Sequence, residues 1–478
     1  MSLTVVSIIN HLPAEILAEI FSTPLSGSIK LPRWSIPSDT DVRTPGRWSL
    51  ASVCQRWRII IFSTPCLWSS FDISVEETPH PSLITALQLF FERSGNYPLT
   101  FALHAPKNAQ RSTFQQVLTC FVKRARQWED VSLNLPLNLL TECTYLRVPD
   151  FCFPRLRNLN VWRWTDENIP DEELRLPAFQ LFPRAPLLSR VRLWGFRYLP
   201  LTLQPPWHQI TYLSMDFIEG SVGWLLDILE HTPNLCVLEF DMFRPIEQLQ
   251  PKTRGNRVLQ LSHLQELTWF CKCMKDYSLF FNHISAPLLT HFTLECSLHA
   301  RHGHWNAIRR FLQRSICSIT HVKLASNFSE HLEPYLDLFP DCEQLELATI
   351  SADSRLRGFG IFKELTIYKE TSVMARVCPK LQRLVLHKME IEEKEEAYSA
   401  FVKMVKSRLR GCGGLCGRGA AVKLEFLQIF IHPKCGSTPS STMPNSYEIL
   451  RGRLSTGELE SVILKSYRIP RQNESTFI

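Results

Sequence analysis

A short apolar pattern recurs along most of this 478-residue chain and constrains its fold more than any other feature. The pattern is apolar-x-x-apolar-x-apolar; it occurs at twelve candidate positions, and successive copies begin 22 to 43 residues apart. Six copies carry a proline two residues before the first apolar position, whereas 31 prolines spread evenly would place about one there. The first apolar positions are Trp128, Leu156, Leu188, Ile210, Leu235, Leu264, Leu289, Ile319, Cys342, Leu381, Leu424 and Leu459.

Each copy of the pattern predicts a short strand that is buried on one face and followed by a helix. Apolar residues at alternate positions are typical of a strand, and a proline at its entry ends the preceding helix and favours extended geometry in its neighbour. The segments 222–230 and 305–313, which lie between copies, are amphipathic at helical spacing. Strand, loop and helix repeated at this period predict an α/β solenoid, with a parallel sheet inside and helices outside.

Two segments before the repeats have a purely helical pattern. In the first, Pro13 suits the opening turn of a helix, where its missing N–H is not needed. The second, 48–62, predicts one helix with an apolar side, while Gln55, Arg56 and Arg58 face water. The apolar side consists of Leu50, Val53, Cys54, Trp57 and Ile61. A bundle of so few short helices buries little apolar surface alone, so we expect a second polypeptide to cover part of it.

The residues of these two segments resemble the F-box motif. The resemblance is carried by Leu12-Pro13, Glu15-Ile16-Leu17, Ile20-Phe21, Val53-Cys54-x-x-Trp57-Arg58 and Pro65-x-Leu67-Trp68. A compact F-box has only a few residues between its halves, whereas here residues 25–47 are inserted, as in the F-box-like proteins of mushroom-forming fungi. The following repeats are similar to leucine-rich repeats of irregular length, although only Asn327 matches the Asn or Cys of the regular motif.

The expected organisation has three parts. An F-box-like module spans 1–72, a linker with a helix spans 73–97, and a curved, leucine-rich-repeat-like solenoid spans 98–478, with flexible loops near 411–420 and 434–446. The resemblance implies that the module binds a Skp-type adaptor through Leu12, Pro13, Ile16, Leu17, Ile20, Phe21, Leu50, Val53, Trp57, Leu67 and Trp68. For Val53 and Cys54, packing inside the chain is an equally good interpretation.

The function that the resemblance implies is that of a substrate-recognition subunit in a Skp–cullin–F-box ubiquitin ligase. The adaptor would connect the chain to cullin and RING subunits, and the repeats would hold a target protein near them. The alternative is an interaction scaffold that binds the adaptor without ubiquitin transfer. On the concave face of the predicted sheet, Arg192, Asp241 and Glu346 are interpreted as solvated polar residues rather than contacts.

Other chemistry finds little support in the sequence. The formal charge of +7 is a mild excess over this length and does not favour nucleic-acid binding. Without a membrane span or signal peptide, the fifteen cysteines are expected to be reduced thiols in the cytoplasm or nucleus. The nearest approach to a zinc site lacks the usual pairs from two separated segments; it consists of Cys296, His299, His302 and His304. We therefore expect no metal, no cofactor and no catalytic residue.

Overall fold

The structure is a computed structural model of the chain. It describes residues 8–22, 29–31, 47–75, 82–106, 108–136, 139, 152–164, 184–196, 206–245, 257–271, 274–296, 305–326, 336–348, 356–357, 362–363, 365–367, 377–390, 395–410, 424–431 and 462–466. Among these residues, no helix combines the length and the hydropathy that crossing a bilayer requires.

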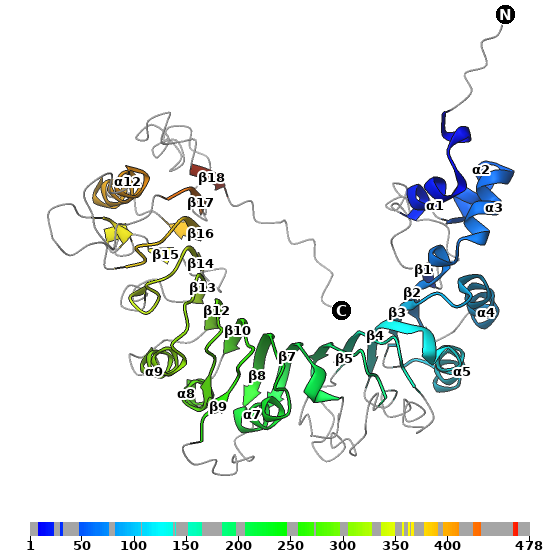
Figure 1. Cartoon of the computed structure of the whole chain (residues 1–478), viewed down its shortest axis with the longest axis horizontal. Coiled ribbons are helices and arrows are strands. Elements are labelled where there is room, and N and C mark those ends of the chain that lie inside the picture. The colour runs from blue at the N-terminus through cyan, green and yellow to red at the C-terminus, as the bar shows by residue number, and fades with distance from the viewer. Residues whose placement is uncertain are drawn as a thin grey trace, which may run out of the picture. The chain divides into compact units, whose positions relative to one another are not determined.

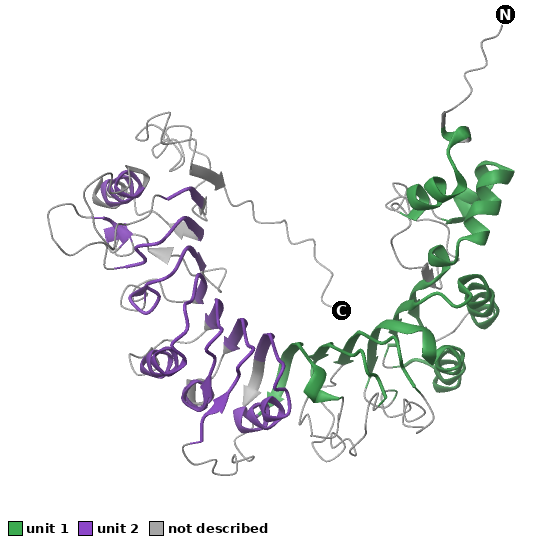
Figure 2. Cartoon of the chain, in the orientation of Figure 1, with its two compact units in different colours: residues 1–220 green, residues 221–478 purple. Residues whose placement is uncertain are grey.

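The protein is α/β, and its strands pair in parallel within two compact units, Met1–Gly220 and Ser221–Ile478 (Figure 2). The first unit begins with a small group of helices, named the helical module here, and continues as a sheet in which β1 to β7 are neighbours in numerical order. The helical module contains η1 (Ile8–His11), α1 (Ala14–Ser22), α2 (Arg47–Val53), α3 (Gln55–Ser63) and η2 (Pro65–Trp68). The strands are β1 (Ile29–Leu31), β2 (Ser70–Ser74), β3 (Leu99–His104), β4 (Trp128–Pro136), β5 (Asn158–Trp164), β6 (Arg190–Trp194) and β7 (Tyr212–Gly220). The remaining helices of this unit are α4 (Leu83–Ser94), α5 (Arg111–Val122), η3 (Ala125–Gln127) and η5 (Trp207–Gln209).

The second unit repeats the alternation of strand and helix. Its main strands are β8 (Val237–Pro245), β10 (Glu266–Cys271), β12 (His291–Cys296), β13 (His321–Ser326), β14 (Gln344–Ala348), β16 (Arg383–Glu390), β17 (Phe426–Ile431) and β18 (Val462–Ser466), in that order in the sheet. β15 (Leu356–Arg357) pairs with β16, and β9 (Leu259–Gln260) pairs with β11 (Ile284–Ser285). The helices are α7 (Val222–Glu230), α8 (Met274–His283), α9 (Trp305–Ser315) and α12 (Glu395–Arg410).

The apolar pattern coincides with a strand at all twelve predicted positions, and in ten of them the strand begins two residues after the first apolar position. The second and third apolar positions pair with their equivalents on neighbouring strands, so their side chains form two rows. Across β12, β13 and β14 these rows are Phe292, Val322 and Leu345, and Leu294, Leu324 and Leu347, all buried. The expectation of a parallel sheet with one buried face is confirmed.

The recurring proline lies in a tight turn just before the strand. The N–H of Leu156 donates to the carbonyl of Phe153 at 3.2 Å, and that of Leu381 donates to Cys378 at 3.2 Å, so Pro154 and the equivalent proline occupy the second position of a β-turn. Proline suits that position because its ring fixes the φ angle that the turn needs. The residue therefore does more than end the preceding helix, since it shapes the entry into each strand.

In each unit the helices cover one face of the strands and leave the other face without helices (Figure 1). The core lies between strands and helices, where aromatic rings from both layers meet. Trp269 of β10 stacks on Phe280 of α8 at 4.0 Å, and Phe101 of β3 contacts Phe121 of α5 at 4.2 Å. The helix predicted within the linker 73–97 and the helices predicted at 222–230 and 305–313 are confirmed as α4, α7 and α9.

The sheet of the first unit begins earlier than the predicted solenoid boundary at residue 98. β2 pairs with β3 in parallel, and Phe71 of β2 contacts Phe91 of α4 at 5.3 Å, so the helix that was predicted in a linker packs on the sheet. The strand β1, which lies inside the insertion 25–47, pairs with β2 through Ile29↔Phe71 and Leu31↔Ile73. The insertion thus supplies the outermost described strand of this sheet.

Candidate protein-binding surfaces

The helical module has a core of its own. Leu17 and Phe21 are buried one turn apart on α1, and Phe21 meets the ring of Trp57 on α3 at 4.7 Å. Trp68 is fully buried and donates its indole N–H to the carbonyl of Ile61 at 2.7 Å, next to buried Leu67. Four of the residues predicted to contact an adaptor are buried in this core and can only support such a surface from below. They are Leu17, Phe21, Leu67 and Trp68.

The predicted single helix 48–62 is two helices, α2 and α3, that break at Cys54. Cys54 has extended backbone angles (φ −156°, ψ 169°), and its Sγ accepts a hydrogen bond from the N–H of Trp57 at 3.4 Å, so it caps α3. Because of this break, the residues of α2 do not face the directions that one continuous helix over 48–62 would give them. Val53 is consequently 59% exposed, and internal packing does not account for it.

An exposed apolar surface remains around this core. Ile16 and Ile20, one turn apart on α1, are 43% and 42% exposed, and Val53 of α2 is 59% exposed. Pro13 is exposed, while Leu12, Leu50 and Trp57 are half-buried. Two further exposed apolar residues, Trp48 and Ile59, were not predicted. Ile59 could have been found, because in the run Ile59-Ile60-Ile61 one helical turn cannot bury all three side chains.

Arg56, which was predicted to face water, connects α3 to the turn before α1. The guanidinium of Arg56 on α3 is half-buried and donates to the carbonyl oxygen of Leu12, just before Pro13 and α1. Because one donor spans the 44 residues between the two helices, the Leu12-Pro13 turn is held against α3. Arg58, in contrast, is exposed as predicted, and it donates to the carbonyl of Ala51 at 3.0 Å.

Arg93 of α4 joins the helical module to the first helix of the sheet. Its guanidinium lies over three aromatic rings, with centroid distances of 5.2 Å to Trp48, 4.2 Å to Phe62 and 4.5 Å to Trp68. Burial lowers the pKa of this guanidinium, and its Nη1 has no hydrogen-bond partner in the described part of the chain. The contact with the rings is therefore the main compensation for taking this charge out of water.

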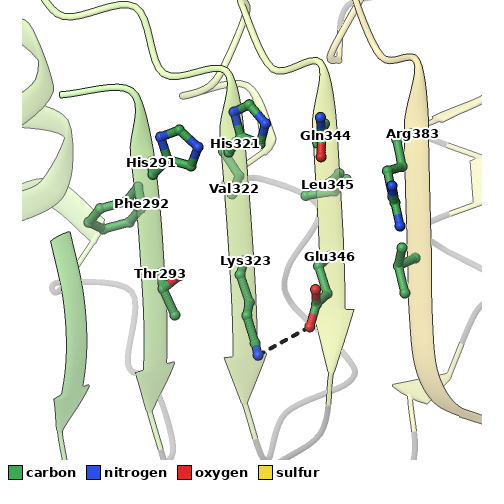
Figure 3. A pocket seen from close by; sticks show the side chains of 11 residues that line it. His291, Phe292, Thr293, His321, Val322, Lys323, Gln344, Leu345, Glu346 and Arg383 are labelled. Atoms are coloured by element: carbon green, nitrogen blue, oxygen red, sulfur yellow. Dashed lines mark ion pairs between the residues drawn. The ribbon is translucent and has the colours of Figure 1, made fainter. Parts of the chain in front are cut away.

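The helix-free face of the second unit carries a depression of about 200 Å³ over β12, β13, β14 and β16 (Figure 3). Its upper edge in Figure 3 is formed by His291, His321, Gln344 and Arg383, which are register partners on four neighbouring strands. We name these four residues the donor row. The rings of His291 and His321 stack at 4.0 Å with an interplanar angle of 15°.

The charges in the lower part of the depression are already matched. Lys323 Nζ lies 3.1 Å from Oε1 of Glu346 and 3.8 Å from Oε1 of Glu295. Glu346 also meets His387 Nε2 at 3.2 Å, and this hydrogen bond, helped by Lys323, lowers the pKa of Glu346 to about 2. Burial raises the pKa of Glu295, an effect that Lys323 partly offsets. Glu346 was interpreted from the sequence as a solvated polar residue, and in the structure it forms the centre of this charge network.

The other two polar residues predicted on the helix-free face differ. In the first unit, Arg192 donates through Nη2 to the hydroxyl of Tyr212 at 2.7 Å, and its guanidinium lies 5.1 Å from the same ring. Arg192 is therefore bound to the neighbouring strand β7 rather than simply solvated. Asp241 is half-buried on β8. No short-range signal in the sequence predicts these contacts, because their partners lie a full repeat away.

Several sequence-based expectations fall outside the described residues. They concern the histidines of the candidate zinc stretch, His299, His302 and His304, and the loops at 411–420 and 434–446. Within the described residues, no group of three or more His, Cys, Asp or Glu side chains could hold a metal ion. No cofactor site is assigned.

No protein-family model matches the chain, and no curated protein is significantly similar to it.

Proposed function

We propose that this chain is the substrate-recognition subunit of a Skp–cullin–F-box ubiquitin ligase. In this proposal the helical module is an F-box-like module that binds a Skp-type adaptor, and the repeats form a solenoid whose helix-free face holds a target protein. Ubiquitin is transferred by other subunits, and the chain raises the local concentration of target lysines near them.

One observation carries the proposal. At the positions where the sequence resembles the F-box motif, the module divides its apolar residues into a sealed core and an exposed set, Ile16, Ile20 and Val53. Apolar side chains about half exposed on short helices are costly in water and favour a partner that covers them. Half-buried Trp57 lies between the two sets, and tryptophan is the residue type that most often dominates such interfaces.

The test is co-expression of the full chain with a Skp-type adaptor and a cullin, followed by affinity purification. The double variant Leu12→Ala/Pro13→Ala removes the side chains of the turn whose backbone carbonyl binds Arg56, and Ile16→Glu/Ile20→Glu places two charges on the exposed stripe of α1. We expect both variants to lose the adaptor while the melting temperature of the chain stays within a few degrees, because the second pair in particular is not in the core.

The control is Leu288→Glu, which places one negative charge on a leucine 51% exposed in the second unit. It should retain the adaptor fully. Recovery of adaptor and cullin together supports the ligase, whereas adaptor without cullin supports the scaffold. Undiminished adaptor recovery from Ile16→Glu/Ile20→Glu would contradict both.

A further inference from the structure

The donor row differs from the two neighbouring rows of the sheet because every one of its four side chains can donate a hydrogen bond. Successive partners on β12, β13, β14 and β16 are His291, His321, Gln344 and Arg383, and each of these side chains can donate a hydrogen bond. Parallel strands lie about 4.8 Å apart, so the four groups form an edge whose donors are spaced for a ligand one or two side chains wide. The depression beside them, about 200 Å³, has room for a side chain rather than for a helix.

The two imidazoles of the donor row are held in place by the residues before them. Thr290 Oγ1 lies 2.9 Å from His291 Nδ1, and Thr320 Oγ1 lies 2.9 Å from His321 Nδ1. The same Thr-His dipeptide thus recurs in consecutive repeats with the same geometry. Since Nδ1 of each ring is engaged, Nε2 is the nitrogen that remains for a ligand, and it has no partner in the described part of the chain.

Arg383 is the cation of this depression that has no acidic partner among the described residues. Its guanidinium lies 4.3 Å from the centre of the Phe426 ring on β17, and a guanidinium that stacks through its face keeps its N–H groups free at its edge. Those N–H groups match the two oxygens of a carboxylate. Lys323, the other permanent cation, is neutralised by Glu346 and Glu295.

We propose that the donor row is an anchor for an acidic side chain, Asp or Glu, of the protein that the repeats hold. Arg383 binds the carboxylate, Gln344 adds a hydrogen bond, and a histidine ring in its protonated form adds another from Nε2–H, because the threonine hydroxyls donate to backbone carbonyls and accept from Nδ1–H. This inference rests on the proposed function in one respect, namely that the molecule bound by the repeats is a protein. A nucleic acid fits poorly, because one unmatched arginine does not provide the series of cations that a phosphate backbone requires.

The histidines give this anchor a predictable pH dependence. Burial and the neighbouring His291 lower the pKa of His321, while Glu343 and exposed Glu266 act in the opposite direction. Gln344 on β14 is uncharged, and Lys323 on the same strand as His321 is paired with Glu346. A bound carboxylate favours the protonated form of His321, so binding takes up a proton and should tighten as the pH falls from 8 to 6.

The experiment measures fluorescence anisotropy of a labelled octapeptide of alternating Gly and Glu with the full chain at pH 6, 7 and 8. The same peptide with Gln in place of Glu is the neutral control, and one with phosphoserine distinguishes phosphate from carboxylate. We expect the Glu peptide to bind about fivefold tighter at pH 6 than at pH 8. Arg383→Gln should weaken it about tenfold, as the loss of a charged hydrogen bond does.

Two variants sharpen the result. His291→Gln/His321→Gln keeps polar side chains and should remove most of the pH dependence. Arg257→Gln removes the same charge from an exposed arginine that pairs with Glu230 away from the depression, and it should leave binding unchanged. Equal binding of the Gln peptide, no binding of the Glu peptide, or equal effects of Arg383→Gln and Arg257→Gln would overturn the proposal.

The remaining outcomes distinguish a carboxylate ligand from a phosphate, and the anchor from the proposed function. Phosphoserine binding more than tenfold tighter than Glu binding would replace the carboxylate by a phosphate. Adaptor capture, measured on the same preparations, is independent of these peptides. If the adaptor is not captured but the Glu peptide binds as expected, the proposed function fails and the anchor stands; the reverse result removes the anchor alone.

Discussion

The helical module and the sheet of the second unit use apolar residues in opposite ways. In the sheet, the pattern residues are buried row by row, and the helix-free face presents polar groups such as Lys323, Glu346 and Arg383. In the helical module, a core around Phe21 and Trp68 leaves Ile16, Ile20 and Val53 in water. The difference teaches that the two regions require different kinds of partner. The module fits one that supplies apolar cover, and the sheet fits one that supplies charges and hydrogen bonds.

The largest effect is expected in the sheet. Leu324→Ala empties one position in a continuous buried row and should lower the free energy of unfolding by about 2 to 5 kcal/mol, as large-to-small changes in packed cores do. The control Leu288→Ala removes the same atoms from an exposed leucine and should cost less than about 0.5 kcal/mol. Urea unfolding of both variants measures the contrast. Similar losses for the two would break the distinction between buried row and surface.

Within the helical module, substitutions at a buried residue and at its exposed neighbour should also differ in their effect on stability. Leu17→Ala is expected to destabilise the module by about 2 to 4 kcal/mol, because Leu17 is fully buried. Ile16→Ala, at the next position, should change stability by less than about 1 kcal/mol and should instead weaken adaptor capture. Limited proteolysis between residues 8 and 68 reports the first effect, and co-purification reports the second. A stable Leu17→Ala chain would show that the module has no real core.

A smaller effect is expected at the connection between module and sheet. Arg93→Ala removes the guanidinium from the rings of Trp48, Phe62 and Trp68, and it should cost about 1 to 2 kcal/mol. Arg93→Lys keeps the charge but loses the planar contact, so it should recover only part of that stability. Arg126→Ala, at an exposed arginine of η3, is the control. Thermal melts measure the melting temperatures of the three variants, and Arg93→Ala should have the lowest. Equal melting temperatures would refute a structural role for Arg93.

The smallest effect concerns the pH dependence of the sheet. The pKa of Glu346 is lowered to about 2, from an ordinary value of 4.5, by His387 and Lys323. A carboxyl whose folded pKa is lowered stabilises the fold above its unfolded value and loses that contribution as the pH falls from about 4.5 toward 2. Glu346 is about a third exposed, so the contribution is less than about 1 kcal/mol. The stability difference between the protein and Glu346→Gln should shrink between pH 6 and pH 3 in denaturant titrations, and a constant difference would contradict the assignment.

The sequence predicted the repeats well because three apolar positions and a proline act together at each strand entry. It predicted the break at Cys54 poorly, because a single extended residue inside a helical pattern leaves no periodic signal. The donor row was also not predicted, since its members lie 23 to 39 residues apart and meet only through strand register. The repeated Thr-His dipeptides at 290–291 and 320–321 are the one signal that could have indicated it.

The strand β1 has a consequence for how this chain could be shortened. It lies between the two halves of the helical module in sequence, yet its backbone pairs with β2 and covers an edge of the sheet. Trimming residues 25–47 to obtain a compact module would make the five-residue β2 the edge strand in place of the three-residue β1, so a longer row of N–H and C=O groups would be unpaired at this edge. Open edges of this kind recruit other chains and promote aggregation. The short β1 is therefore expected to be the safer edge, and a minimal version of this protein should keep Ile29 to Leu31.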